Sequence, residues 1–219
     1  MSPDEFVHAL GLHRTSAIVR ADSQAVARGA MNAAITGGVR IVEFTLTTPG
    51  ALDLVAEFAG RDPIEPVDGI DRVVVGAGTV LTVDQARDAV RAGARFLVSP
   101  VADARVIRAA ADLGVAMIPG VHTPTEMLRA HEDGAPLLKL FPAPAGGPAY
   151  LRSVLAPLPF LKIVPTNGVD ESNIAAWIAA GAWAVGLVGP LFLAEDLASQ
   201  NWPAIETRAA KLRALAKIA

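Results

Sequence analysis

The sequence predicts an α/β protein: a single (β/α)8 TIM barrel with an extra helix at its N-terminus. Short apolar runs that end in Gly, Pro, Ser or Thr alternate with helix-patterned stretches of about 10–15 residues, which is typical of repeated βα units. Eight such runs can be counted. The 219 residues also lie within the roughly 200–250 that one such barrel occupies. We therefore expect residues 1–219 to form one domain.

The eight apolar runs predict the strands of a parallel sheet. In chain order they are 16–20, 39–46, 73–77, 95–99, 115–119, 137–141, 161–165 and 183–188. Helices are expected between them, among them 23–36, 82–92, 103–113, 123–132 and 170–180, and a last helix over about 202–217 closes the ring. Several of these helices open with Ser, Thr or Asp, which can cap the first free amide groups.

Four helix-to-strand junctions carry glycine at the same place, at Gly38, Gly93, Gly114 and Gly181. Glycine there suits the left-handed residue that ends a helix before the chain re-enters the sheet. The charged segment 61–72 interrupts this rhythm and is interpreted as a solvated surface insertion.

Composition excludes several classes of partner and chemistry. The formal net charge of −3 provides no basic face for nucleic acid or an anionic membrane. The absence of cysteine excludes disulfides, thiolate catalysis and Cys-ligated metal, and it fits a cytoplasmic protein. The acidic start lacks the features of a signal peptide. Residues 174–194 carry no charge, but glycines divide this stretch into a helix, a turn and a strand, so we expect no membrane span.

Lys139 is the most informative side chain, because it lies in the otherwise apolar run 137–142. A buried amine must be paired or neutral, and a neutral amine can attack a ketone. A structural ion pair, or a side chain whose tip reaches solvent at the strand end, is the alternative. The other three lysines have simpler explanations: Lys211 and Lys217 belong to a solvated helix face, and Lys162 lies near the entry end of its strand.

The second strand places Glu43, Thr45 and Thr47 on one face. Glu43 is a candidate acid/base, because imine chemistry needs a group that carries protons to and from the substrate. It could equally serve only to neutralise Lys139 or Arg20, and the two roles are compatible. Arg20 ends the first strand, where it could bind a carboxylate or form a surface salt bridge.

Loops after the predicted strands offer further polar groups. Thr79 follows the third strand, and Thr166 and Gly168 follow the seventh, where barrels commonly bind anions. The four histidines are not spaced as ligands on one helix face, so neither a metal nor a cofactor is expected.

Together these motifs resemble the 2-keto-3-deoxy-6-phosphogluconate and 4-hydroxy-2-oxoglutarate aldolases, which are class I enzymes with a trimeric barrel. The similarity runs from about Thr15 to the end. It rests on the segments 17–20, 38–46, 76–81, 98–100, 119–120, 123–126, 138–142 and 165–169.

The resemblance implies a lyase of carbohydrate metabolism that cleaves a 2-keto-3-deoxy sugar acid to pyruvate and an aldehyde, and a homotrimer. It makes Lys139 the Schiff-base lysine and Glu43 the proton shuttle. The residues that it places around the substrate are Arg20, Thr79, Pro100, Phe141, Thr166, Gly168 and Gly189.

The chain departs from the family pattern at Thr47, Asn167 and the Val188-Gly189 pair. Relatives carry an arginine, a glycine and a Gly-Ser pair there, so the departures weaken the expected phosphate site without affecting the lysine. Two other functions stay open: a phosphate-binding isomerase or epimerase barrel, and a barrel that binds keto acids without turnover.

Overall fold

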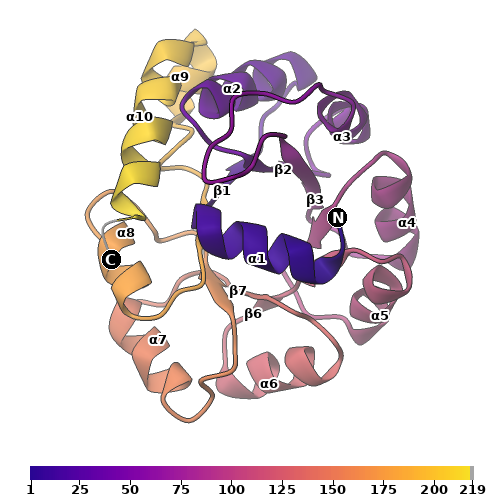
Figure 1. The fold of residues 1–219 in the computed structure, drawn as a ribbon, viewed down its shortest axis with the longest axis vertical. Helices are drawn as coiled ribbons and strands as arrows, with labels where there is room; N and C mark the ends of the chain where they lie inside the picture. The colour runs from indigo at the N-terminus through magenta and orange to yellow at the C-terminus, as the bar shows by residue number, and fades with distance from the viewer. Residues whose placement is uncertain (218–219) are drawn as a thin grey trace.

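The computed structural model describes residues 1–217, whose strands form a curled parallel sheet with helices packed around its outside (Figure 1). The elements are α1 (Pro3–His13), β1 (Thr15–Val19), α2 (Gln24–Thr36), β2 (Ile41–Thr45), α3 (Ala51–Ala59), β3 (Val74–Gly78), α4 (Val83–Arg91), β4 (Phe96–Val98), α5 (Ala104–Asp112), β5 (Ala116–Ile118), β6 (Gly120–Val121), α6 (Pro124–Glu132), β7 (Leu138–Leu140), α7 (Gly147–Leu155), β8 (Ile163–Pro165), α8 (Ile174–Ala179), β9 (Val185–Leu187), α9 (Ala194–Ser199) and α10 (Trp202–Leu215).

The predicted strands are all present, each within two residues of its expected ends. The helices expected between them are also present, and the side chains of Ser23, Thr82, Asp103 and Thr123 cap α2, α4, α5 and α6 as expected. The helix expected from Asp170 begins later, after Asn173. The carboxylate of Asp170 instead accepts hydrogen bonds from the amide and hydroxyl of Ser172, which hold a turn before α8.

Within residues 1–217 the strands are paired in two parallel sheets that meet at both edges. The larger has the order β5-β4-β3-β2-β1-β9 and the smaller the order β6-β7-β8. Pro119 alone separates β5 from β6. At the other edge a parallel bridge joins Thr166, just after β8, to Gly186 of β9. The strands therefore form a curled parallel sheet.

Alternation along the strands separates two apolar cores. One set of side chains, including Val42, Phe44 and Leu97, packs outward against the helices. The other set points into the space that the sheet encloses, and it includes Ile41, Val98 and Val164. This is the expected geometry of strands that are covered on both faces.

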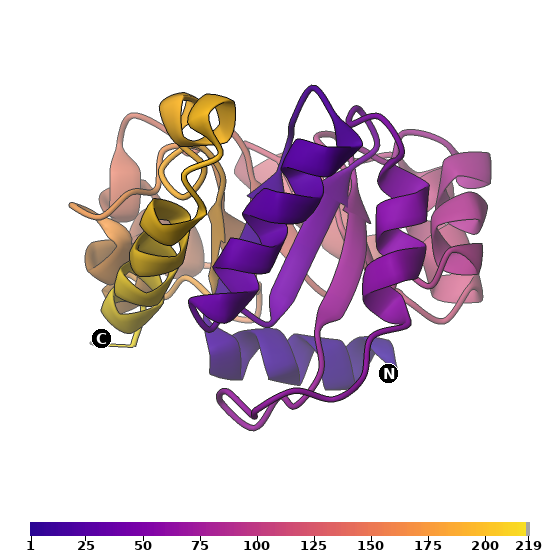
Figure 2. The ribbon, with the colours of Figure 1, turned by 90° about the horizontal axis from the view of Figure 1, so that it is seen from above.

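Helix α1 covers the end of the sheet at which the strands begin (Figure 2). Phe6 is fully buried, and its ring stacks on that of Phe96 with 4.4 Å between centroids. The indole of Trp183 donates a hydrogen bond to the carbonyl of Val7 at 2.9 Å. The enclosed space is therefore largely apolar and closed below, and most of its polar groups lie toward the end at which the strands stop.

Glycine occupies the left-handed region at the four junctions where the sequence predicts it. The φ angles are +95° at Gly38, +105° at Gly93, +72° at Gly114 and +101° at Gly181. Each glycine lets the chain leave a helix and turn into the next strand without the steric cost that a Cβ would bring.

The segment 61–72 is more than the solvated insertion that the sequence indicates, because Asp68 anchors it. The Asp68 carboxylate contacts Nδ1 of His13 at 3.0 Å, Arg213 at 3.4 Å and Lys217 at 3.0 Å. His13 is fully buried, and its Nε2 accepts a hydrogen bond from the amide of Arg40 at 3.1 Å. A neutral imidazole that donates from Nδ1 and accepts at Nε2 satisfies both contacts. The insertion is thereby tied to α1 and to the last helix.

The uncharged stretch 174–194 is divided as expected into α8, the turn at Gly181 and strand β9. Among residues 1–217, no helix combines the length and the apolar character needed to cross a bilayer.

Burial of His13 predicts a measurable dependence of stability on pH. Burial is the main cause that lowers the pKa of His13 from 6.5 to about 4, although Asp68 acts in the opposite direction. The unfolded chain therefore binds more protons between these two values, and the free energy of unfolding falls as pH decreases from 6.5. Across this window the free energy of unfolding falls by up to about 1.4 kcal/mol for each pH unit.

We expect urea unfolding between pH 4.5 and 7 to give a shallower pH dependence for His13→Gln than for the wild type. Glutamine stays neutral and can still accept the Arg40 amide. Equal slopes for the two proteins would contradict a buried neutral imidazole.

Candidate active site

A cavity of about 140 Å³ opens at the end of the sheet at which the strands stop. Its walls come from residues spread over most of the chain, so the fold alone brings them together. They are Ile18, Arg20, Glu43, Thr45, Thr79, Pro100, Lys139, Phe141, Thr166, Asn167 and Val188. Seven of the residues that the sequence singles out, namely Arg20, Glu43, Thr79, Pro100, Lys139, Phe141 and Thr166, lie in this one wall.

Lys139 reaches this cavity from the middle of β7. Its neighbours along the strand, Leu138 and Leu140, point into the outer core, so alternation turns Lys139 inward. The side chain is 8% exposed, and among residues 1–217 its ammonium forms no ion pair within 4 Å. The Nζ atom lies 5.1 Å from the centre of the Phe141 ring. The amine is thus enclosed but free to react.

Glu43 faces the same cavity from β2, where it pairs in register with Ile18 of β1 and Gly76 of β3. It is 2% exposed. Burial raises the pKa of its carboxyl group, and the charges of Lys139 and Arg20 partly oppose this effect. A carboxyl group with a raised pKa, close enough to an amine to feel its charge, is suited to accept and return a proton.

The position of the Glu43 carboxylate depends on Gly78 at the end of β3, two residues beyond Gly76, its partner in register. A Cβ built on Gly78 would lie 1.8 Å from Oε1 of Glu43, far closer than any real contact. Gly186 likewise leaves room for Thr166, because a Cβ added to Gly186 would lie 2.4 Å from Oγ1 of Thr166. Residues without side chains at these two points leave room for the polar groups of the cavity.

Two residues of the wall adopt a backbone conformation that their side chains disfavour. Thr79 has φ +61° and Asn167 has φ +61°. Asparagine tolerates the left-handed region, but a β-branched threonine there is a real outlier. Such strain persists where the surrounding structure fixes the residue, and it is concentrated at functional sites.

Hydroxyl groups line the side of the cavity next to Arg20. Thr45 donates to the carbonyl of Val19 at 3.3 Å, and its Oγ1 lies 3.1 Å from that of Thr47. Thr47 lies beyond the end of β2 and is exposed. Arg20 is also exposed, so its guanidinium group is available to an anion that enters from solvent.

Two of the residues that the sequence singles out, Gly168 and Gly189, lie in the loops after β8 and β9 and are not part of this wall. The sequence did not single out Ile18, although it alternates with Arg20 on the inward side of β1. Asn167 and Val188, noted in the sequence only as departures from the family pattern, do line the cavity.

The loop after β8 is held by its own side chains. The side chain of Asn173 accepts from the amide of Asp170 at 2.9 Å and donates to the carbonyl of Gly168 at 3.0 Å. The Asp170 carboxylate holds the amide of Ser172 at 2.8 Å. The amides of Asp170 and Ser172 are therefore already satisfied within the loop.

No group of three His, Asp or Glu side chains in the described part of the chain is arranged to hold a metal ion. The chemistry that this wall offers is that of an amine, a carboxyl group, a guanidinium group and several hydroxyls.

Comparison with known proteins gives one consistent result. The family model described as KDPG and KHG aldolase matches residues 9–208. The chain is 39% identical over 161 residues to the 2-dehydro-3-deoxy-phosphogluconate aldolase of Treponema pallidum, covering 70% of this chain and 73% of that protein. It is 34% identical over 182 residues to the 2-dehydro-3-deoxy-6-phosphogalactonate aldolase of Escherichia coli, covering 81% and 84%.

Solved structures agree with the sequence comparison. KDPG aldolase from Legionella pneumophila, with pyruvate captured as a covalent carbinolamine, superposes with a TM-score of 0.82 at 26% identity and covers 94% of this chain and 97% of its own. A native KDPGal structure superposes with a TM-score of 0.79 at 31% identity, covering 92% and 93%. The curled parallel sheet is shared with these proteins.

Proposed function

Because the chain belongs to the KDPG and KHG aldolase family, we propose that Lys139 is its imine-forming residue and Glu43 its proton shuttle. The chain is a class I aldolase, a carbon–carbon lyase that cleaves 2-keto-3-deoxy sugar acids. One observation carries the assignment of the two residues: a buried lysine without an ion pair within residues 1–217 lines the same cavity as a buried glutamate.

The reaction begins at the amine. The unprotonated amine of Lys139 attacks the C2 ketone of the substrate and forms a carbinolamine. The carbinolamine hydroxyl group takes up a proton and leaves as water, which gives a protonated imine. A carbinolamine with pyruvate is the species named in the Legionella structure. The side chain of Lys139 is 8% exposed, so its amine meets the substrate largely shielded from bulk water.

Cleavage requires a base. Glu43, acting through a water molecule, removes the proton of the C4 hydroxyl group as the C3–C4 bond breaks, and the bonding electrons pass into the imine to give an enamine. The aldehyde leaves, Glu43 returns the proton to C3, and hydrolysis releases pyruvate and free Lys139. The raised pKa of Glu43 brings this carboxyl group closer to the range in which it can both accept and donate.

The remaining residues of the wall orient the substrate. Arg20 binds the carboxylate of the keto acid, because its planar fork matches two oxygens. Thr79, Pro100 and Phe141 enclose the pyruvate part, and Thr166 contacts the tail. Gly168 and Gly189 would act only on a tail that extends beyond the wall, toward the loops after β8 and β9.

We further propose that residues 1–219 form one domain in which the two sheets close as a (β/α)8 barrel behind α1. The bridge from Thr166 to Gly186 and the continuity of β5 and β6 across Pro119 support this. A cytoplasmic location and a role in carbohydrate metabolism stay predictions, and fractionation of cells would test the first.

The central prediction concerns Lys139. Incubation with pyruvate followed by borohydride reduction should add one pyruvate-derived group to the peptide that contains Lys139, as detected by mass spectrometry. Lys139→Ala should lose both the adduct and aldol cleavage.

Lys162→Ala is the matched control, because Lys162 lies by the Trp183 ring, 5.3 Å from its centre, and not in the cavity. Cleavage without an adduct would exclude imine chemistry at Lys139. A folded wild type with neither adduct nor cleavage would favour an isomerase, and an adduct without cleavage would indicate a barrel that only binds keto acids.

A second prediction separates the roles of the two residues. Glu43→Gln should still form the borohydride-trapped adduct with pyruvate, because Lys139 and the cavity remain. Its rate of aldol cleavage should fall by about 10²–10⁴-fold, the usual contribution of a general acid–base. Cleavage at the wild-type rate would show that another group moves the proton.

We propose the homotrimer from the family resemblance. Light scattering should give about three times the chain mass of 22.7 kDa. A monomeric mass at micromolar concentration would rule the trimer out.

A further inference from the structure

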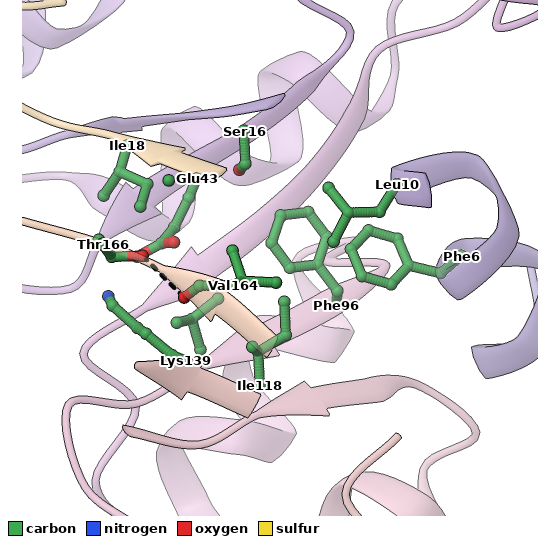
Figure 3. A pocket seen from close by; sticks show the side chains of 12 residues that line it. Phe6, Leu10, Ser16, Ile18, Glu43, Phe96, Ile118, Lys139, Val164 and Thr166 are labelled. Carbon is green, nitrogen blue, oxygen red and sulfur yellow. Dashed lines mark hydrogen bonds between the residues drawn. The ribbon is translucent and has the colours of Figure 1, made fainter. Parts of the chain in front are cut away.

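A second, much smaller cavity lies beneath the catalytic one, between Glu43 and the apolar plug formed by α1 (Figure 3). Its floor is apolar and includes Phe6, Phe96 and Ile118. Its polar lining comes from Ser16, Glu43, Lys139 and Thr166. The enclosed volume is about 10 Å³. That is space for about one water molecule.

Two oxygen atoms of this lining lack a partner in the protein. Ser16 Oγ and Glu43 Oε1 are both buried from solvent. Within residues 1–217 neither atom takes part in a hydrogen bond. Ser16 is 7% exposed and Glu43 2%. Thr166 differs, since its hydroxyl donates to the carbonyl of Val164 at 3.4 Å. Buried polar groups without a partner are costly, and ordered water usually satisfies them.

Packing alone does not explain a hydroxyl group at position 16. The inward residues on this level of the neighbouring strands include Ile41 and Val74, which belong to the inner apolar core. In the register of β1 with β9, Ser16 lies opposite Gly186, which adds no side chain of its own. A serine here places a polar atom in an otherwise apolar layer, below the carboxyl group that the reaction uses.

We propose that Ser16 holds a single water molecule in this cavity against the carboxylate of Glu43, and so acts as a positioning residue for the proton shuttle. This rests on the proposed role of Glu43. The water accepts from or donates to the Ser16 hydroxyl and donates to one carboxylate oxygen. The other oxygen is left for the substrate side.

The water also affects when Glu43 is ionised. A hydrogen bond to the charged carboxylate favours that form and opposes the effect of burial. The charged groups that act on Glu43 are Lys139, from β7, and Arg20, which follows β1; both also favour ionisation. Removing the water should therefore raise the pKa of Glu43 further and make it a base only at higher pH.

The test is Ser16→Ala, which deletes one oxygen and adds no bulk. The acidic limb of the pH profile of kcat/KM should move up by about one pH unit, the shift expected when a charged group loses one hydrogen bond. On the acidic limb of the profile, kcat should fall several-fold, while KM and the pyruvate adduct on Lys139 stay as in the wild type. A high-resolution crystal structure should contain the water in the wild type and lack it in the variant.

Thr15→Val is the matched control. Thr15 is the preceding residue of the same strand, and its buried Oγ1 also lacks a partner within the described chain. Alternation points it away from the enclosed space. Its pH profile should match that of the wild type, so an upward shift in both variants would indicate a general effect of β1 and overturn the proposal.

Two results would defeat the proposal without touching the proposed function: a dry cavity in the wild type, or an unchanged acidic limb in Ser16→Ala while Glu43→Gln is inactive. If Glu43→Gln retains full cleavage, the proposed role of Glu43 fails first, and the role of Ser16 fails with it.

Discussion

The interaction on which the site depends is the burial of an amine, Lys139, near a carboxyl group, Glu43, in one small enclosed space. Either charge alone would be expensive, because the sheet and the α1 plug exclude most water. The two are coupled, since Lys139 opposes the effect of burial on the pKa of Glu43. The enclosure therefore keeps the amine and the carboxyl group out of bulk water, whereas an exposed pair would be solvated and unreactive.

Room for this pair comes from residues that have no side chain. Gly78 and Gly186 leave the space that the carboxylate and the Thr166 hydroxyl occupy. Thr79 accepts a left-handed backbone at the rim. The two apolar cores fix the strands on both faces and so offset the loss of stability that these features cause. A rigid, well-packed sheet is what allows a strained and partly polar interior to persist.

Sequence patterns predicted the eight strands, the junction glycines and five of the wall residues, because period-two alternation and glycine punctuation are local signals. The other two, Pro100 and Phe141, came from the family resemblance. The patterns did not predict the anchoring of segment 61–72, because the contact between His13 and Asp68 joins residues 55 positions apart. The need for glycine at position 78 was equally hidden, since only the path of the Glu43 side chain toward β3 reveals it. Ser16 gave no signal, because a single serine in a strand is ordinary. Each of these depends on which residues the fold brings together.

Two buried titratable groups then act on stability in opposite directions. His13 is held neutral below the sheet, so acid destabilises the fold as pH falls from 6.5 toward about 4. Glu43 has a folded pKa above its ordinary value of 4.5, so it favours the fold when protonated, and that contribution is lost as pH rises through the folded pKa. Ionisation of the Glu43 carboxyl group, which the reaction requires, therefore lowers the stability of the fold. His13 lowers the stability only as pH falls below 6.5, so its neutral imidazole imposes no such loss at higher pH.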